Sequence, residues 1–484
     1  MYIGIDLGTS SVKLLLMNKT GSVINTVTKD YPLIFVKDTW IEQNPEDWFK
    51  SVLEGLKELV KGYEKSISAI SFSGQMHGLV VLDENNNVIR PAILWCDQRT
   101  EKECIYLNEK IGKDFLLEHT GNIALTGFTL PKILWMKNNE PEKFKQISKV
   151  MLPKDYIVYK LSGKFVTDVS DASGMLILNV KDRKWSEEMI KISGLKKENF
   201  AEIHESYEQV GILKNEIAEK FNLNKGIKII VGGGDQAIGA VGVGVVNSDY
   251  LSVALGTSGV VFSNSSNYTY DRNGRLHSFC HSSGEYHQMG VILSAASCLK
   301  WWVEEINKTK NYEKIIKEAE KSECSNLYFL PYLVGERTPH NDVNVRGAFI
   351  GLNINHKRED MTKAVLEGVA FALRDSYEIL KEMKIKSKII RLSGGGSRNT
   401  LWREIICNVF NLETEIVNSL DGPAFGAAII ATVGDGIYKN VNEACASIIK
   451  PLQRIYPNKG KTEYYDKKYN NFKKLYPILK EFYN

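Results

Sequence analysis

The sequence predicts an α/β protein made of two duplicated domains, and two repeated patterns support that prediction. The first is Leu-Gly-Thr-Ser, which occurs at residues 7–10 and again at 255–258, each time between two short apolar runs typical of a β-hairpin. The second is a run of three glycines at 232–234 and at 394–396, each after a short apolar strand and before a helix. Each half therefore holds one hairpin turn and one triglycine turn, which indicates internal duplication.

Length and composition agree with this organisation. A chain of 484 residues exceeds what one core usually supports, and 43% hydrophobic and 25% charged residues are ordinary for a globular protein. The net charge of +4, from 62 basic and 58 acidic residues, gives no indication of nucleic-acid binding. Seven cysteines without close pairs favour reduced thiols over a disulfide framework.

We expect a cytoplasmic protein with no membrane partner. The apolar start of the chain is interrupted at Asp6 and lacks a basic leader. The most apolar later stretch, 237–246, is too short to span a bilayer.

Several elements follow from periodicity and start signals. Residues 68–73 indicate a strand, and residues 100–160 are mostly helical, with breaks near Gly121 and Pro153. Helices are expected at 40–59 with a start signal at Asn44-Pro45, at 235–245, at 363–382, after 397 and from 421 onward. The boundary between the halves is expected at 246–249, which gives domains of residues 1–247 and 248–484.

The first hairpin turn has the composition of a phosphate site. Gly8 can take the positive φ of a tight turn and lets a ligand approach the backbone. Thr9, Ser10 and Ser11 offer N–H and O–H donors that suit phosphate oxygens. Asp6, at the end of the first strand, can hold Mg²⁺ through water.

Asp235 is the strongest catalytic candidate. It follows a triglycine turn at the start of a helix, where the helix dipole should keep its carboxylate ionised. An ionised carboxylate beside a phosphate site can accept a hydroxyl proton during phosphoryl transfer. The alternative is a simple helix N-cap. With two phosphate-type turns in the chain, we favour the catalytic base.

Two stretches of the first half combine polar and apolar side chains in a way that suits a sugar. Met76 and His77 follow a strand, where ligand contacts are common in α/β proteins. The alternative is a structural histidine beside a core methionine. Trp95, Asp97 and Arg99 join an apolar ring to hydrogen-bonding groups, although an ordinary salt bridge next to a core indole fits equally well.

Two further motifs receive structural interpretations. His277, Cys280 and His281 have metal-ligand chemistry, but no fourth ligand lies nearby and the run reads as a strand, so zinc is not favoured. The loop from Pro331 to Pro339 reads as a rigid crossover containing a buried ion pair.

These motifs resemble, almost end to end, the FGGY family of carbohydrate kinases. The matching segments are residues 5–10, 74–78, 152–156, 232–235, 297–299 and 335–340. The resemblance implies two domains of the ribonuclease H-like, actin–hexokinase type with ATP in the cleft between them. Within the family, Gln-Met-His-Gly at 75–78 resembles the members that act on D-xylulose, since glycerol kinases carry an Arg-Glu-containing sequence there.

The resemblance also implies roles for individual residues. Asp235 matches the catalytic base, and Asp6 matches an essential carboxylate, both near a Mg²⁺ ion. The implied sugar-binding residues are Met76, His77, Gln75, Trp95, Asp97 and Gln236. The implied ATP-binding residues are Thr9, Ser10, Lys13, Thr257, Gly395, Gly396 and Asn399. Two positions depart from the family pattern, Ser11 where glycine is frequent and Cys96 where asparagine is frequent.

The activity implied is ATP- and Mg²⁺-dependent phosphorylation of the 5-hydroxyl of D-xylulose. The main alternative is the same reaction on another ketopentose or polyol such as ribulose or glycerol. An actin- or chaperone-like ATPase fits the twin phosphate turns but has no use for the sugar-type residues 75–77. A sugar-binding regulator without catalysis is disfavoured, because both carboxylates are present. The expected partners are a small sugar and ATP, and a homodimer is left open.

Overall fold

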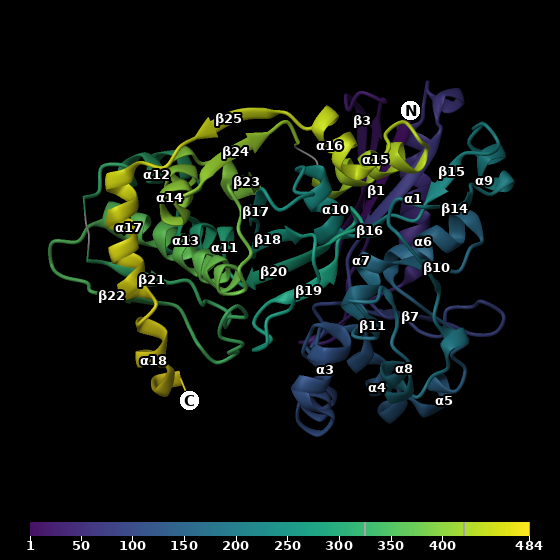
Figure 1. Ribbon diagram of the computed structural model, residues 1–484, viewed down its shortest axis with the longest axis horizontal. Helices are drawn as coiled ribbons and strands as arrows, with labels where there is room; N and C mark the ends of the chain where they lie inside the picture. Colours follow the sequence, from purple (N-terminus) through teal and green to yellow (C-terminus); the bar gives the residue numbers. More distant parts are fainter. Residues whose placement is uncertain (324–325, 420–421, 484) are drawn as a thin grey trace.

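The computed structural model describes residues 1–323, 326–419 and 422–483, which form two α/β domains lying side by side (Figure 1). The first domain is built on a sheet whose main path is β14-β15-β6-β1-β2-β3. The strands, in that order, are Gln209–Ile212, Lys228–Ile230, Ala69–Gly74, Tyr2–Leu7, Ser11–Met17 and Val23–Asp30. A short strand β16, Gly233–Gly234, also pairs with β6. The α/β, two-domain prediction is confirmed.

The second domain is built on a sheet of order β19-β20-β18-β17-β23-β24-β25. The strands, in that order, are His277–Cys280, Tyr286–Ile292, Gly259–Ser265, Tyr250–Leu255, Ile389–Ser393, Glu413–Val417 and Pro451–Ile455. The strand β17 forms an antiparallel hairpin with β18 and pairs in parallel with β23. In the first domain β1 forms the same hairpin with β2 and pairs in parallel with β6. The duplication is therefore present in the sheet topology.

The two triglycine turns are not equivalent, contrary to the sequence prediction. The first follows β15, which pairs with β6 and not with the hairpin strand β1. The second follows β23, which pairs directly with the hairpin strand β17. The glycines encode a local turn from strand to helix, and they carry no information on the position of the strand within its sheet.

Two helices from different halves cross between the domains. Helix α10, Asp235–Gly242, packs against α15, Gly422–Gly434, and α15 also lies on β1 of the first sheet. A Cβ added at Gly426 would lie 2.0 Å from the carbonyl oxygen of Ile238, so only glycine permits this approach. The largest apolar cluster consequently includes residues of both halves.

Most predicted elements are found close to their expected positions. Helix α13 covers Arg358–Glu382, α14 covers Thr400–Phe410, and α3, Lys113–Thr120, ends at the predicted break. Helix α1 covers Pro45–Leu59, and the side chain of Asn44 accepts the N–H of Glu46 as its cap. The predicted start at residue 40 was too early, because Trp40–Gln43 is strand β5. The predicted start at 421 lies outside the described residues.

None of the helices in the described ranges combines the length and hydrophobicity that crossing a membrane requires.

Candidate active site

The first hairpin turn joins the end of β1 to the start of β2, two interior strands of the first sheet. Asp6 on β1 and Lys13 on β2 face each other across the antiparallel pair. The positive φ expected for Gly8 is not found. A Cβ at Gly8 would lie 3.0 Å from the carbonyl oxygen of Ser11, so close backbone approach accounts for this glycine.

The turn before Asp235 is tightly packed, and its first glycine, Gly232, is required because an added Cβ would meet backbone. Gly232 has φ +74°, and a Cβ there would lie 2.0 Å from the carbonyl oxygen of Phe72. A Cβ at Gly233 would lie 2.5 Å from Ser170 Oγ. At Gly234 it would lie 2.8 Å from Met76 Sδ. The turn therefore fixes the start of α10 directly beside Met76.

Burial raises the pKa values of the two predicted catalytic carboxylates, and the charge of Asp6 further raises that of Asp235. Burial raises the pKa of Asp6 to about 6, opposed by the charge of Lys13. Burial, followed by the negative charge of Asp6, raises the pKa of Asp235 to about 7, opposed by hydrogen bonds from Gln236. A pKa of about 7 leaves Asp235 only partly ionised at neutral pH, which differs from the expectation that the helix dipole keeps it ionised.

A cavity of about 540 Å³ lies between the domains and holds this carboxylate pair. Its predicted site residues from the first half are Asp6, Lys13, Asp235 and Gln236, and it is completed from the second half by residues including Gly256, Ser258, Gly394 and Gly395. The structure thus brings the strands that flank the first hairpin turn, the start of α10 and both glycine turns of the second half to one space, whereas Thr9 and Ser10 are not among the residues that line it.

A second cavity, of about 800 Å³, lies in the second half. It gathers the predicted nucleotide residues Thr257, Gly395, Gly396 and Asn399. Apolar and aromatic side chains that include Leu299, Tyr312, Ile316 and Trp402 form other walls. Because Gly395 lines both cavities, a ligand in the second cavity can extend toward Asp235.

His77 projects from a strained turn after β6. Its φ is +68°, a value uncommon for a residue with a side chain. Its Nδ1 lies 2.8 Å from the carbonyl oxygen of Gly174. Burial lowers the pKa of His77 to about 3, so the ring is neutral. A carbonyl only accepts, so Nδ1 carries the proton and Nε2 is left as a hydrogen-bond acceptor.

Lys132 holds the backbone of His77 in this conformation, and sequence analysis missed it. Its fully buried Nζ donates to the carbonyl oxygens of His77 at 2.9 Å and of Gly127 at 2.5 Å. Burial lowers the pKa of Lys132 to about 7. The signal that could have found it is a lone lysine inside the otherwise apolar run of α4, Thr129–Asn139, which is buried through Met136.

Gln75 braces the first hairpin turn. Its Nε2 donates to the carbonyl oxygen of Gly8 at 3.3 Å and to Gln43 Oε1 at 3.0 Å. Gln43 in turn donates to the carbonyl oxygen of Thr9 at 2.7 Å. The side chain of Gln75 is buried, so its sugar contact stays a prediction while its contact with the phosphate-type turn is observed. Gln43 carried no recognisable signal in the sequence.

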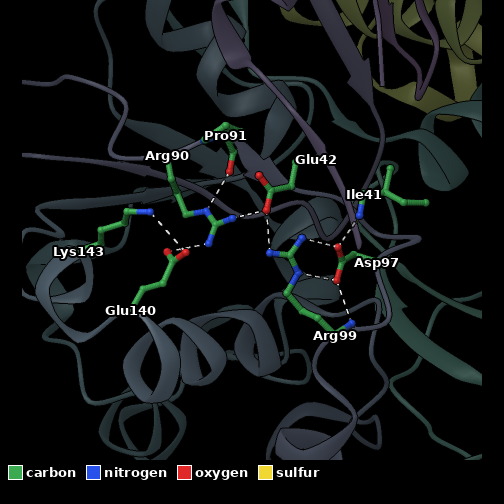
Figure 2. A network of polar contacts seen from close by, with 8 residues as sticks. All are labelled: Ile41, Glu42, Arg90, Pro91, Asp97, Arg99, Glu140 and Lys143. Carbon is green, nitrogen blue, oxygen red and sulfur yellow. Dashed lines mark hydrogen bonds and ion pairs between the residues drawn. The ribbon is translucent and has the colours of Figure 1, made fainter. Parts of the chain in front are cut away.

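Trp95 and Asp97 lie in different environments, the first exposed and the second buried. Trp95 is 43% exposed, and its Nε1 donates to Thr9 Oγ1 at 3.0 Å, so its ring lies beside the first turn. Asp97 is fully buried, and its two carboxylate oxygens accept from Arg99 and from the N–H of Ile41 (Figure 2). This is the salt bridge that the sequence left open as the alternative for Asp97.

The network around Asp97 continues away from the cleft. Arg99 donates to Glu42 at 2.7 Å, Glu42 also accepts from Arg90, and Arg90 donates to Glu140 at 2.7 Å (Figure 2). These contacts join β5 to the segment that carries Trp95. The network therefore supports the position of Trp95.

The strand predicted around His277 is β19, and both His277 and His281 are buried and neutral, because burial lowers their pKa values. Within the described ranges no group of three or more His, Cys, Asp or Glu side chains is arranged to hold a metal ion.

The structure thus combines a two-domain fold with a carboxylate pair in the interdomain cleft and a neighbouring cavity with apolar walls, an arrangement that can hold two small molecules side by side. The chain belongs to the FGGY family of carbohydrate kinases: the N-terminal domain profile of that family matches residues 1–242 and the C-terminal profile matches residues 251–434.

Individual relatives agree with this family. The chain is 39% identical to a xylulose kinase of Staphylococcus xylosus, covering 98% of this chain and 99% of that one. The structure of a ligand-bound xylulose kinase from Lactobacillus acidophilus superposes with a TM-score of 0.96 at 28% identity, over 100% of this chain and 99% of that one. A gluconate kinase structure from the same organism gives the same TM-score and identity, over 100% and 98%. The fold therefore does not select the sugar.

Proposed function

We propose that the chain transfers the γ-phosphoryl group of ATP to the 5-hydroxyl of D-xylulose, with Asp235 as the general base. The observation that carries this proposal is the close approach of Gly234 to Met76, which places Asp235, a lining residue of the cavity that joins both halves, next to the segment of His77. The xylulose kinase names of full-length relatives at 37–39% identity support the choice of sugar.

In this reaction the ionised carboxylate of Asp235 accepts the proton of the sugar hydroxyl. A bond forms between that oxygen and the γ-phosphorus, and the bond from the phosphorus to the leaving oxygen of ADP breaks. A pKa of about 7 makes Asp235 an effective proton acceptor near neutral pH. His77 accepts a hydrogen bond from another sugar hydroxyl through Nε2 and so orients the substrate.

The residues present fit a divalent cation. Asp6 and Asp235 repel each other, and the buried Oδ1 of Asp6 has no hydrogen-bond partner among the described residues. Mg²⁺ prefers such carboxylate oxygens, usually with bound waters. When bound, the cation neutralises charge on the phosphate oxygens. Asp6 and Asp235 are the residues that would hold it.

The donor nucleotide occupies the cavity of the second half in this proposal. The apolar walls of that cavity suit a base, and the glycine turn at 394–396 leads from it to the carboxylate pair. Thr9, Ser10 and Lys13 of the first hairpin and Thr257 of the second then contact the phosphates.

The decisive experiment is ADP release measured with D-xylulose, D-ribulose, gluconate and glycerol. The proposal requires the highest kcat/KM with D-xylulose. A clear preference for gluconate, the substrate named for one structural neighbour, would assign the chain to that activity instead. ADP release that is independent of any sugar would indicate an ATPase.

Two other expectations, a homodimer and a cytoplasmic location, stay predictions. Analytical ultracentrifugation and fractionation of cells that express the protein check them.

A further inference from the structure

Residues 168–175 contact both the turn before Asp235 and the side chain of His77, and the proposed function gives them no role. All eight residues are buried, and sequence analysis attached no function to them. We call this stretch the support segment. It consists of the last residue of β10, Val166–Asp168, the short helix α7, Val169–Ala172, and a 3₁₀ turn, Ser173–Met175.

The first part of the support segment holds the glycine turn. Ser170 donates its hydroxyl proton to Asp168 Oδ2 at 2.5 Å, which leaves its Oγ as an acceptor. That oxygen accepts the backbone N–H of Gly234 at 3.1 Å. A Cβ added at Gly233 would lie 2.5 Å from the same oxygen, so the hydroxyl packs directly against the turn. Because Asp235 follows Gly234 as the first residue of α10, Ser170 fixes the backbone that carries the proposed base.

The partner of Ser170 is itself fixed. Asp168 caps α7 by accepting the N–H of Ser170 at 2.8 Å, and it lies 3.1 Å from Lys154 Nζ. Lys154 also lies 2.7 Å from Asp155, and all three charged side chains are fully buried. Buried charges are stable only when they are paired, so this cluster resists rearrangement. The direction of the Ser170 hydroxyl is therefore set by a rigid network.

The last part of the support segment holds His77. The carbonyl oxygen of Gly174 accepts the Nδ1 proton of His77 at 2.8 Å. A Cβ added at Gly174 would lie 2.3 Å from that Nδ1 and 3.3 Å from Met76 Cε. The φ of Gly174 is not in the left-handed region, so the histidine ring, and not a backbone conformation, accounts for the glycine at this position.

The second half of the chain also contacts the support segment. Ser173 Oγ accepts the N–H of Cys280, the last residue of β19, at 3.0 Å. Ser282 donates to Ser170 Oγ at 3.3 Å. The segment is thus packed between the two sheets, and the contacts with the Asp235 turn and with His77 lie only four residues apart on it. One rigid piece of chain sets the distance between them.

We propose that Ser170 and Gly174 are positioning residues of the sugar site. Ser170 places the backbone of Asp235 relative to the acceptor hydroxyl, and Gly174 holds the ring and the tautomer of His77. The inference rests on the proposed function, since it takes Asp235 as the base and His77 as a sugar ligand. In-line transfer is sensitive to such placement, because a shift of about 1 Å can cost about 100-fold in rate.

The first test is a double-mutant cycle between Ser170 and the base. Ser170→Ala should lower kcat roughly 10- to 100-fold and change KM for the sugar by less than about twofold. In the Asp235→Asn background the same change should lower kcat by less than about threefold, because no base is left to misplace. Ser193→Ala is the control: this serine of α8, Glu187–Ser193, is equally buried and accepts the N–H of Leu195 at 3.1 Å, and its kcat should stay at the wild-type value.

The second test is a cycle between Gly174 and His77. Gly174→Ala should raise KM for D-xylulose roughly 3- to 10-fold, the size of one lost hydrogen bond, and leave KM for ATP unchanged. In the His77→Ala background it should raise KM no further, because no ring is left to displace. If Gly174→Ala alone does not fold, the melting temperature replaces KM as the readout, and the double variant should recover it.

Losses that disappear in the second background support the proposal, because a purely structural effect would be the same in both. Equal losses in both backgrounds, or no loss in the single variant, remove that residue from the proposal, and this result in both cycles overturns it. The proposed function fails separately: near-normal turnover of Asp235→Asn or near-normal sugar binding by His77→Ala shows that before any double variant is made.

Discussion

Burial and, after it, the negative charge of Asp6 at the end of β1 raise the pKa of Asp235 at the start of α10. The two carboxylates lie far apart in the sequence and share one cavity. Because the two negative charges repel each other, Asp235 holds its proton at lower pH, and the carboxylate pair can bind a cation. Four predictions follow from this site and from the elements that hold it.

The first concerns the base itself. Asp235→Asn should retain sugar binding and lower kcat by roughly 10²–10⁴-fold, the usual contribution of a general base. For the wild-type enzyme, kcat/KM should rise with pH and level off above the Asp235 pKa of about 7. Steady-state kinetics between pH 5 and 9 measure both effects; near-normal turnover of the asparagine variant would exclude Asp235 as the base.

The second prediction is the effect of the same residue on stability. The pKa of Asp235 is raised from 3.8 to about 7 in the folded protein, so the folded state binds this proton more tightly than the unfolded chain. The resulting stabilisation is complete below the unfolded pKa and is lost as the pH rises through the folded pKa. Asp235→Asn removes the ionisation and should therefore melt at a higher temperature than the wild type at pH 8.

That difference should shrink as the pH falls toward 5, and melting curves without metal at the two pH values measure it. A variant that is less stable than the wild type at pH 8 would contradict the prediction.

The third prediction concerns Lys132, which donates to the carbonyl oxygen of His77. Lys132→Met leaves the carbonyl oxygen of Gly127 without this donor, at a cost of about 1–3 kcal/mol, whereas the carbonyl oxygen of His77 keeps the hydroxyl of Thr129 as a donor. The left-handed turn at His77 should relax, raising KM for the sugar about tenfold while KM for ATP stays unchanged. Lys137→Met, on the exposed side of the same helix, is the control and should behave as wild type. An equal rise in both KM values would indicate general unfolding of the cleft.

The fourth prediction is closure of the cleft. Asp235 comes from the first half, and Thr257, Gly395 and Asn399 come from the second. Phosphoryl transfer needs donor and acceptor close and in line, so we expect the halves to approach each other when both ligands are bound. The segment 246–249, between α10 and β17, is the expected hinge.

Small-angle scattering should give a smaller radius of gyration with D-xylulose and a non-hydrolysable ATP analogue than with either ligand alone. Identical radii in all three states would count against closure, and ATP hydrolysis without sugar should be slow.

The sequence by itself determined the local elements of this protein and the identity of its strongest candidate residues. Asn44 before Pro45 sets the start of α1, and the glycines at 232–234 predict the turn that precedes Asp235. Such features depend on neighbours in the chain, through backbone sterics and capping, so a sequence pattern is sufficient to find them. The duplicated hairpins were visible for the same reason.

Only the tertiary structure decided which side chains face the cleft and in what charge state. Gln75 and Asp97 carry polar groups that suit a sugar, yet long-range packing directs the first to Gly8 and buries the second against Arg99. Asp235 starts a helix as predicted, but its pKa depends on burial and on Asp6 across the sheet. Desolvation and hydrogen-bond partners arise from residues distant in the chain, and no local pattern encodes them.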